Sequence, residues 1–324
     1  MIEVLSNGAL NLVQDTGRPA HLGIGVSNSG AMDAPALQIA NLLVGNDEGA
    51  AGIEICIFPF RVKLHQDAWF ACTGAVTTVT LPLRSYPSWW AAHARAGDTI
   101  TVTPPQHGSR AFLAFRGGIE VPRVLGSRAT DIKSGFGGVD GRGLRKGDQL
   151  TLGPSADDVG LRSFGVAPVS RTRFIEELAS GSVKVRAIAA AEYDEFTDEA
   201  RAAFDGTEYQ LTPDCNRQGY RLEGKVLKTS RPLELLSHGV VPGVVQVPPS
   251  GQPIVQMAEA NTIGGYPKIA TVIEADIWRL AQLRPGQRIR FELVDHPSGV
   301  AASRENLAEQ QRLRDGLSLM ARRP

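Results

Sequence analysis

The chain has 324 residues, of which 42% are hydrophobic and 21% are charged, the mix of a soluble globular protein, and its length favours two domains. Lys and Arg together number 34, as do Asp and Glu, so the formal net charge is zero. Nucleic acids and anionic membrane surfaces usually require a basic excess, and the balance of charge therefore argues against both as partners.

The sequence carries no signal for secretion, membrane insertion or metal binding. Residues 1–14 contain neither the basic nor the apolar region of a secretory signal, and no apolar run approaches the ~20 residues of a membrane span. The three cysteines, Cys56, Cys72 and Cys215, are too far apart for a CxxC site and odd in number for a disulfide framework. No histidines show the spacing of a ligand pair. We therefore expect a cytoplasmic protein with reduced cysteines and no bound metal.

Short apolar segments of alternating polarity, separated by Gly and Pro, predict a mainly β chain of the barrel or sandwich type. The segments are 69–71, 76–81, 99–103, 111–115, 149–152, 183–187, 244–247 and 288–293. Helical signals are few, and they predict helices over 33–43, 192–204 and 304–321. The first helix has the clearest signal, because Asp33 can cap it, Pro35 lies in its first turn and Gly45 follows it.

A glycine turn before a strand recurs three times, at 96–100, 146–150 and 285–289. In each copy a polar residue follows the glycine, which suits such a turn because glycine tolerates positive φ. The last two copies each follow Leu-Arg and would close a β module. The repeat therefore indicates two related modules, residues 1–155 and 165–295, with a boundary near 154–168, followed by a helical tail over 296–324.

The first module contains two glycine-rich loops, each with two interpretations. The loop over 16–33 holds Ser29 and Asp33 and leads into the helix that carries Asn41. Its backbone amides suit an oxyanion, whereas a tight turn with an N-cap explains the same residues. The loop over 116–142 either offers Arg128 or Arg142 to a carboxylate or phosphate, or is a long barrel loop that needs a flexible backbone. Neither loop has a P-loop or dinucleotide-binding pattern.

The second module contains two further loops with candidate binding residues. In the loop over 213–222, Arg217 suits a carboxylate; alternatively it is a surface ion-pair partner and Tyr220 a core residue. The loop over 241–268 combines glutamines, an acid, an amide, a hydroxyl, a tyrosine and a lysine, a dense set of groups for binding an amide or urea-like compound. Lys268 either stabilises a developing anion or is solvated, and as a loop lysine it should bury little area.

Several motifs in fixed order carry a family resemblance. They lie at 29–33, 41–46, 125–128, 216–217, 246–249 and 264–268. With them the chain resembles, over nearly its whole length, the family of biotin-dependent carboxyltransferases and 5-oxoprolinase C subunits, which also includes the matching half of the carboxyltransferase domain of urea carboxylase. The resemblance implies two cyclophilin-like β-barrel domains with a few helices. It also implies a kinase-inhibitor-like partner, the B subunit, which builds the other half of the site, and a third component, the A subunit.

The chain departs from the family pattern at two places. The family usually has Ser-Asn-Arg-Met-Gly-Tyr where this chain has Cys-Asn-Arg-Gln-Gly-Tyr at 215–220. It usually has Asp-x-Gln-Thr-Thr-Gly-Gly-Tyr-Pro where this chain has Glu-Ala-Asn-Thr-Ile-Gly-Gly-Tyr-Pro at 259–267. The residues expected to build the scaffold match the family, whereas some residues expected to face the substrate differ. The resemblance therefore supports the family's fold, and it supports the family's substrate less strongly.

The resemblance implies one component of an ATP-dependent 5-oxoprolinase complex, in which ATP activates the lactam oxygen of 5-oxoproline and water then attacks to give glutamate. ATP is expected to be bound by the complex and is not placed on this chain. One alternative is transfer of a carboxyl group from carboxybiotin to urea or a similar amide, with the biotin on another polypeptide, because this chain has no Ala-Met-Lys-Met attachment sequence. Another is a regulatory role, in which the chain binds its partner without catalysis. A homo-oligomer is also compatible with the sequence.

Residue type suggests the roles at such a site. Lys268 and Gln246 would polarise the amide, and Glu259 would place the water. Arg217 or Arg128 would hold the ring carboxylate. The full set of expected substrate-binding residues is Ser29, Asp33, Asn41, Arg128, Asn216, Arg217, Tyr220, Asn261, Thr262 and Tyr266.

Overall fold

The alternating segments form strands in the computed structural model, which describes residues 1–154 and 162–321. Two of them coincide with the observed elements: β12 is Gln149–Leu152 and β22 is Arg288–Leu293. The others lie within observed strands or overlap them, and the predicted mainly β class with few helices is confirmed. No described helix is long and apolar enough to cross a membrane.

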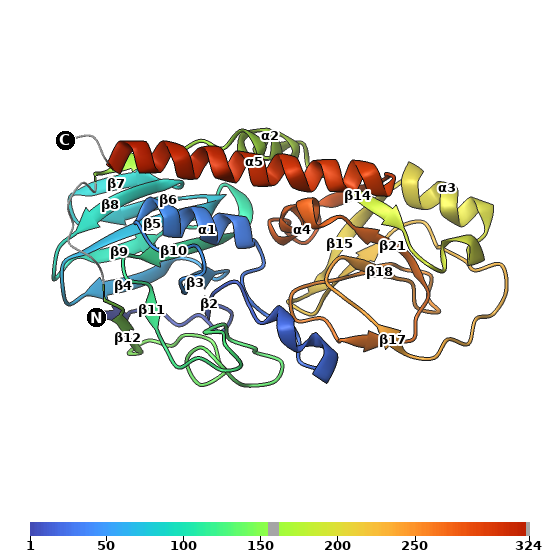
Figure 1. Cartoon of the computed structure of the whole chain (residues 1–324), viewed down its shortest axis with the longest axis horizontal. Helices are drawn as coiled ribbons and strands as arrows, with labels where there is room; N and C mark the ends of the chain where they lie inside the picture. Colours follow the sequence, from blue (N-terminus) through green and yellow to red (C-terminus); the bar gives the residue numbers. More distant parts are fainter. Residues whose placement is uncertain (155–161, 322–324) are drawn as a thin grey trace. The chain divides into compact units, whose positions relative to one another are not determined.

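The chain divides into two units (Figure 1). Unit 1 consists of Met1–Arg18, Ser29–Val169 and Glu309–Pro324, and unit 2 of Pro19–Asn28 and Ser170–Ala308. The predicted module bounds stay a prediction, because the boundary near 154–168 falls partly on 155–161, outside the described residues.

Unit 1 contains two antiparallel sheets. The seven-stranded sheet has the order β11-β12-β1-β4-β9-β6-β7, and the six-stranded sheet has the order β13-β8-β5-β10-β3-β2. The bounds of the remaining strands are β1 Ile2–Val4, β2 Leu12–Gln14, β3 Gly52–Ile55, β4 Phe60–Leu64, β5 Ala68–Val76, β6 Thr78–Leu81, β7 Arg84–Pro87, β8 Trp90–Ala94, β9 Thr99–Val102, β10 His107–Phe115, β11 Ile119–Glu120 and β13 Phe164–Gly165.

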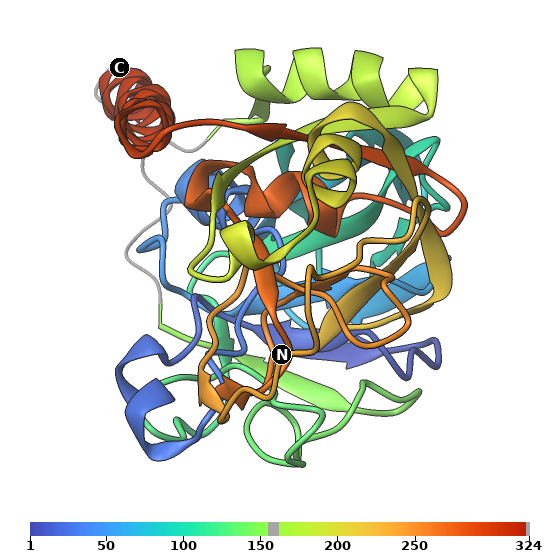
Figure 2. The same ribbon diagram turned by 90° about the vertical axis from the view of Figure 1, so that its right-hand side faces the viewer.

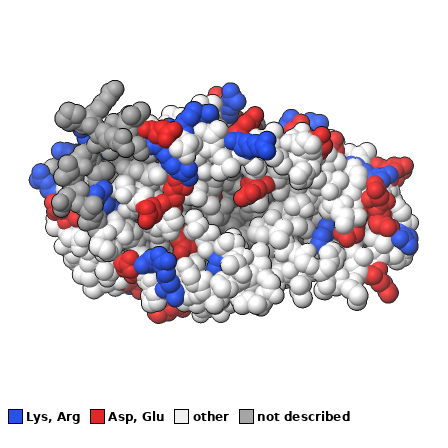
Figure 3. All heavy atoms as spheres, viewed as in Figure 1, with Lys and Arg blue, Asp and Glu red and all other residues white. Residues whose placement is uncertain are grey.

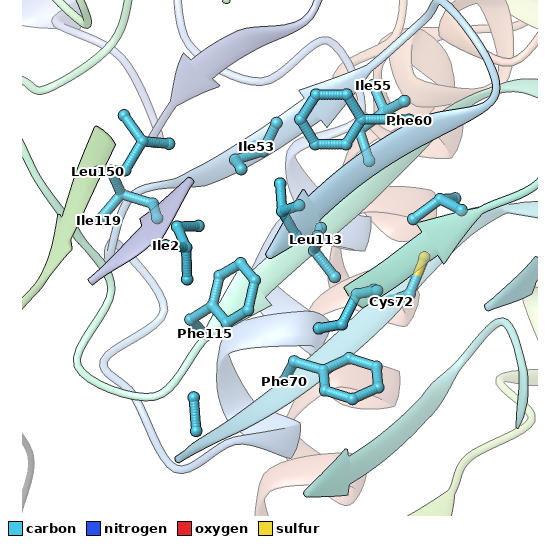
Figure 4. Close-up of a cluster of buried hydrophobic side chains, with 14 of the residues drawn as sticks. Ile2, Ile53, Ile55, Phe60, Phe70, Cys72, Leu113, Phe115, Ile119 and Leu150 are labelled. Carbon is cyan, nitrogen blue, oxygen red and sulfur yellow. The ribbon is translucent and has the colours of Figure 1, made fainter. Parts of the chain in front are cut away.

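The two sheets of unit 1 share one hydrophobic core (Figure 4). Ile2 and Phe60 from the seven-stranded sheet and Phe70 and Leu113 from the six-stranded sheet are each at most 1% exposed and belong to the same cluster. Residues 111–115 of β10 are buried on both faces of the sheet, and their side chains point alternately to one face and the other. Leu113 faces this core, while Phe112 packs in a second cluster with helix α1 (Ala34–Leu43).

Unit 2 is built on a closed barrel. Its strands follow the order β14-β21-β18-β19-β16-β15-β22, and the parallel pair of β14 with β22 closes the ring, which leaves no open sheet edge. Strands β17 and β20 form a separate two-stranded ribbon. The bounds are β14 Ser182–Ala189, β15 Glu208–Cys215, β16 Gly219–Glu223, β17 His238–Gly239, β18 Val244–Gln246, β19 Ile254–Gln256, β20 Ile263–Gly264 and β21 Lys268–Val272.

The three glycine turns predicted from the sequence share one geometry. Gly97, Gly147 and Gly286 have φ of 91°, 94° and 90°. In each turn the side chain of the residue after the glycine accepts a hydrogen bond from the backbone N–H three residues before it, at 2.8–2.9 Å. The short repeat in the sequence therefore corresponds to a repeated local structure that leads into β9, β12 and β22.

Helix α1 confirms the clearest helical prediction. Asp33 is its N-cap and accepts from the backbone N–H of Ala36 at 3.1 Å, Pro35 lies in its first turn, and Gly45 follows it with φ of 73°. The single helix predicted over 192–204 is wrong, since the segment divides into the 3-10 turn η2 (Tyr193–Glu195) and helix α3 (Asp198–Gly206). Thr197 is extended and accepts from the backbone N–H of Ala200, so a new helix begins there.

Helix α5 (His296–Ala321) begins earlier than the predicted start at 304, because Asp295 accepts from the backbone N–H of Ser298 and caps the helix there. Figure 1 shows α5 from the side as one continuous helix, and Figure 2 views it along its axis. The division between the two units falls within it, after Ala308. The remaining helical segments are η1 Pro19–Ile24, α2 Val169–Ser180 and α4 Glu274–Ala281.

Charged side chains of both signs are interspersed on the face shown in Figure 3, without a large area of one sign. This mixture agrees with the equal numbers of basic and acidic residues in the sequence.

Candidate functional site

Lys268 is the first residue of β21 and is 6% exposed, so the expectation that it buries little area is wrong. It pairs with Gln246 of the neighbouring strand β18, next to an irregularity in the register between Val245 and Gln246. Its backbone N–H donates to Glu192 Oε2 at 3.0 Å. The barrel therefore holds Lys268 at a strand start instead of leaving it in a solvated loop.

The ammonium group of Lys268 faces His238 and Glu192. Its Nζ contacts Nε2 of His238, and His238 Nε2 lies 3.5 Å from Glu192 Oε1. His238 Nδ1 lies 3.0 Å from the Leu236 carbonyl oxygen, which can only accept, so Nδ1 carries the proton and Nε2 is left to face the ammonium group. Burial lowers the pKa of Lys268, and the nearby Glu192 carboxylate opposes that shift.

The three side chains range from buried to accessible. Lys268 is 6% exposed, whereas the side chains of Glu192 and His238 are 13% and 43% exposed. A reacting molecule can therefore reach His238 directly, while the lysine behind it is desolvated. A desolvated amine next to an imidazole and a carboxylate is an arrangement that can hold or transfer a proton and stabilise a developing negative charge.

Gln246, the strand partner of Lys268, has its side-chain amide engaged by neighbouring residues. Its Oε1 accepts from Gln256 Nε2 at 3.0 Å, and its Nε2 lies 3.5 Å from the Tyr266 carbonyl oxygen. A Cβ on Gly264 would lie 2.6 Å from Gln246 Nε2, so a larger residue there would displace the end of the Gln246 side chain. Gly264 also pairs with His238 in the β17–β20 ribbon. Gly264 is therefore the strand partner of His238 and a close neighbour of the Gln246 amide.

Arg217 and Glu259 form a buried ion pair. Arg217 Nε lies 2.6 Å from Glu259 Oε1, and the two side chains are 6% and 1% exposed. The backbone supports the pair, because the N–H of Glu259 donates to the carbonyl of Arg217 at 2.8 Å. The interaction ties the segment after β15 to the segment after β19 and engages the carboxylate that the sequence analysis assigned to water activation.

The other predicted residues of unit 2 are spread over turns and loops. Asn216 is exposed, and its Oδ1 accepts from the backbone N–H groups of Gln218 and Gly219 at 2.8 and 3.2 Å, as in an Asx turn. Tyr220 is 1% exposed within the barrel wall. The three remaining residues lie along one loop and its short strand, with Asn261 exposed, Thr262 half-buried and Tyr266 48% exposed.

Two of the predicted residues of unit 1 have structural roles in the described contacts. Asp33 caps α1, and Asn41 donates from Nδ2 to the carbonyls of Glu48 and Ala50 at 3.2 and 2.7 Å. Ser29 is 1% exposed and has φ of 52°. Arg128 lies 2.5 Å from a Glu120 carboxylate oxygen and lines a cavity of its own unit.

Sequence reasoning missed Glu192 and His238. They lie 76 and 30 positions from Lys268, and neither has a neighbouring partner in the sequence that would single it out. His238 is linked to the Gly-Gly-Tyr-Pro-Lys motif by its strand pairing with Gly264. That pairing joins residues far apart in the chain, so no pattern within one segment predicts it. Within the described residues, no group of three or more His, Cys, Asp or Glu could hold a metal ion.

Comparison with known proteins agrees with this architecture. Residues 24–293 match the family described as the carboxyltransferase domain, subdomain A and B. The C subunit of 5-oxoprolinase from Escherichia coli (strain K12) is 45% identical over 291 residues, which is 90% of each chain. That of Haemophilus influenzae is 38% identical over 307 residues, 94% of this chain and 95% of the relative.

A solved structure extends the similarity to the fold. The crystal structure of K. lactis urea amidolyase matches with a TM-score of 0.87 and 28% identity, over 98% of this chain but only 20% of that one. This chain thus corresponds to about a fifth of a much larger protein, whereas it matches the C subunit of 5-oxoprolinase along most of its length. The chain belongs to the carboxyltransferase domain family, subdomain A and B, and within it to the C subunits of 5-oxoprolinase.

Proposed function

We propose that this chain is the C subunit of an ATP-dependent 5-oxoprolinase complex, which hydrolyses the lactam of 5-oxoproline to glutamate. The higher identity to 5-oxoprolinase subunits than to urea amidolyase supports this reaction over carboxyl transfer. The observation that carries the proposal is the desolvated Lys268 ammonium group, which contacts His238 and belongs to the strand residue paired with Gln246. This combination suits a substrate whose amide oxygen becomes negative during the reaction.

In this proposal ATP, bound by the complex at a site not placed on this chain, activates the lactam oxygen. Water then attacks the carbonyl carbon, the C–N bond breaks, and the ring nitrogen takes up a proton to become the amine of glutamate. Lys268 stabilises the negative charge that develops on the oxygen, since a buried ammonium group acts in a low dielectric. The Gln246 amide binds the lactam group by hydrogen bonds. Both roles use side chains that the barrel fixes before the substrate arrives.

We assign proton acceptance from the attacking water to His238 in place of Glu259. The His238 side chain is 43% exposed, whereas Glu259 is buried and engaged by Arg217. The Nε2 lone pair of His238, which the Lys268 ammonium group contacts, becomes available to the water when that group turns to the developing oxyanion. Glu192 would stabilise the imidazolium that forms. The Arg217–Glu259 pair then acts by positioning the adjoining loops, with Asn261, Thr262 and Tyr266 available to the substrate.

The proposed partners are the B subunit, a kinase-inhibitor-like protein, and the A subunit, and the complex is proposed to be cytoplasmic. The E. coli and H. influenzae relatives are themselves named as one subunit of 5-oxoprolinase, which supports a multi-subunit enzyme. The isolated chain should therefore show little turnover.

The test is reconstitution of the chain with homologues of the A and B subunits, followed by an assay of glutamate formed from 5-oxoproline with and without ATP. ATP-dependent glutamate formation by the complex, lost in a His238→Ala variant, would support the proposal. Carboxylation of urea from carboxybiotin by the same complex, without 5-oxoproline hydrolysis, would favour the carboxyltransferase alternative. Tight partner binding with neither reaction would favour a regulatory binder.

A further inference from the structure

Unit 1 contains a cavity of about 530 Å³ whose described walls are strongly polar. Small-molecule sites commonly have volumes of ~300–1,000 Å³ and mostly apolar walls. Here the wall contains Arg116, Arg123 and Arg128 and no aromatic side chain. A ligand with a large apolar part, such as a nucleobase, would find little to stack on, so the wall favours a small and polar one.

Two of the arginines are held in place by the fold. Arg128 donates from Nε to the Val121 carbonyl at 3.2 Å and from Nη2 to Glu120 at 2.5 Å. Arg116 donates from Nη1 to the Val44 carbonyl at 3.1 Å. Fixed guanidinium groups lose little side-chain entropy when a ligand binds, which favours recognition of an oxyanion.

The third arginine has no partner within the described part of the chain. Arg123 is exposed and lines the cavity, and none of the described residues forms a hydrogen bond or ion pair with it. Nη1 of Arg128 likewise has no acceptor among those residues. The cavity therefore presents guanidinium donors that internal carboxylates do not occupy.

The two aspartates in the cavity wall do not form ion pairs with these arginines among the described contacts. Asp15 accepts from the backbone N–H groups of Gly17 and Arg128 at 2.8 and 2.6 Å and from Ser127 Oγ at 2.6 Å. Its negative charge thus stabilises the loop backbone and does not pair with a guanidinium group of the cavity. Asp47 is exposed at the wall and can accept from an N–H or hydroxyl of a ligand.

We propose that this cavity binds a small polar oxyanion, a carboxylate or phosphate compound, through Arg123 and Arg128. The site goes beyond the proposed function, because no step of the amide chemistry in unit 2 requires it. It also gives Arg128 a binding role different from the one expected for the ring carboxylate at the Lys268 cluster.

The experiment is calorimetric titration of the chain with inorganic phosphate, ATP, 5-oxoproline and glutamate, with 2-pyrrolidone as a neutral analogue of 5-oxoproline. Phosphate and ATP binding without carboxylate binding would identify a phosphate site, and the reverse a carboxylate site. The neutral analogue should not bind. Affinity should fall as salt is raised, because the arginine that lacks a partner is exposed.

Arg123→Gln is the diagnostic variant, and it should weaken binding by ~10–100-fold, the loss expected for one charge-assisted hydrogen bond. Arg61→Gln is the matched control in the same unit, because Arg61 is exposed on β4 and does not line the cavity. If 5-oxoproline also binds at the Lys268 cluster, a Lys268→Met variant will retain the binding that Arg123→Gln removes.

The inference is overturned if none of the anions binds, or if Arg123→Gln and Arg61→Gln have equal effects. Because the readout is binding by the chain, a reconstituted complex without 5-oxoprolinase activity would reject the proposed function and leave this site in place.

Discussion

Replacement of Lys268 by methionine separates catalysis from stability. Methionine has a similar length and can occupy the same buried space, so the change removes the ammonium group and leaves most of the packing. Loss of a preorganised donor to a developing oxyanion typically lowers the rate by ~10²–10³-fold, or about 2.7–4 kcal/mol. We expect kcat of the reconstituted complex with Lys268→Met to fall by that factor.

The same substitution should leave stability at neutral pH nearly unchanged or higher. A shape-conserving core change usually costs less than ~1.5 kcal/mol, and here it also removes a buried charge. Burial lowers the pKa of Lys268 from its ordinary value of 10.5, so the unfolded chain binds more protons than the folded chain between the lowered pKa and 10.5. The free energy of unfolding of the wild type should therefore increase as the pH rises through that window. The variant, which lacks the titrating amine, should not show this increase.

The assay is kcat for 5-oxoproline hydrolysis, with urea denaturation of the chain at neutral pH and near pH 10. Lys225→Met is the control, because Lys225 is exposed in the same unit, and it should change neither kcat nor the pH dependence of unfolding. An unchanged kcat for Lys268→Met would refute the catalytic role. A large loss of stability at neutral pH, with kcat falling only through unfolding, would make the lysine structural.

Three further predictions concern buried groups. Glu259→Gln leaves the guanidinium of Arg217 buried without its counter-charge and should destabilise the chain by about 3–5 kcal/mol in urea denaturation; a loss below about 1 kcal/mol would contradict a buried ion pair. Gly30→Ala places a Cβ 2.7 Å from backbone at a φ of 79° and should cost more than about 1 kcal/mol, whereas Gly23→Ala, with open space around it, should stay within about ±0.5 kcal/mol; equal melting temperatures would disprove the difference. Burial raises the pKa of Cys72 to about 12, so iodoacetamide should spare it in the native chain near pH 8 and modify it after denaturation, and mass spectrometry showing rapid native labelling would argue against its burial.

The sequence determined the features that depend on neighbouring residues. Asp33, Pro35 and Gly45 fixed the limits of α1, and the alternating segment 288–293 became β22 with the same bounds. The glycine turns before β9, β12 and β22 could be predicted from the sequence, because a turn with a left-handed residue favours glycine at that position. These interactions involve only neighbouring residues, so they do not depend on how the rest of the chain is arranged.

Local signals were weaker where two of them competed. The segment 192–204 was predicted as one helix from its periodicity. Thr197 interrupts it, because its side chain caps a new helix that begins at Asp198. The length of α5 depended in the same way on Asp295, which caps the helix well before the predicted start at 304.

Only the tertiary structure decided which side chains meet. The register of β18 and β21 pairs Gln246 with Lys268, and the fold brings His238 from a separate ribbon into contact with the lysine ammonium group. The same folding buried Lys268 and engaged Glu259 with Arg217, which changed the roles expected from residue type. Strand register and burial depend on long-range pairing and on the closing of the barrel, and a pattern within one segment does not contain that information.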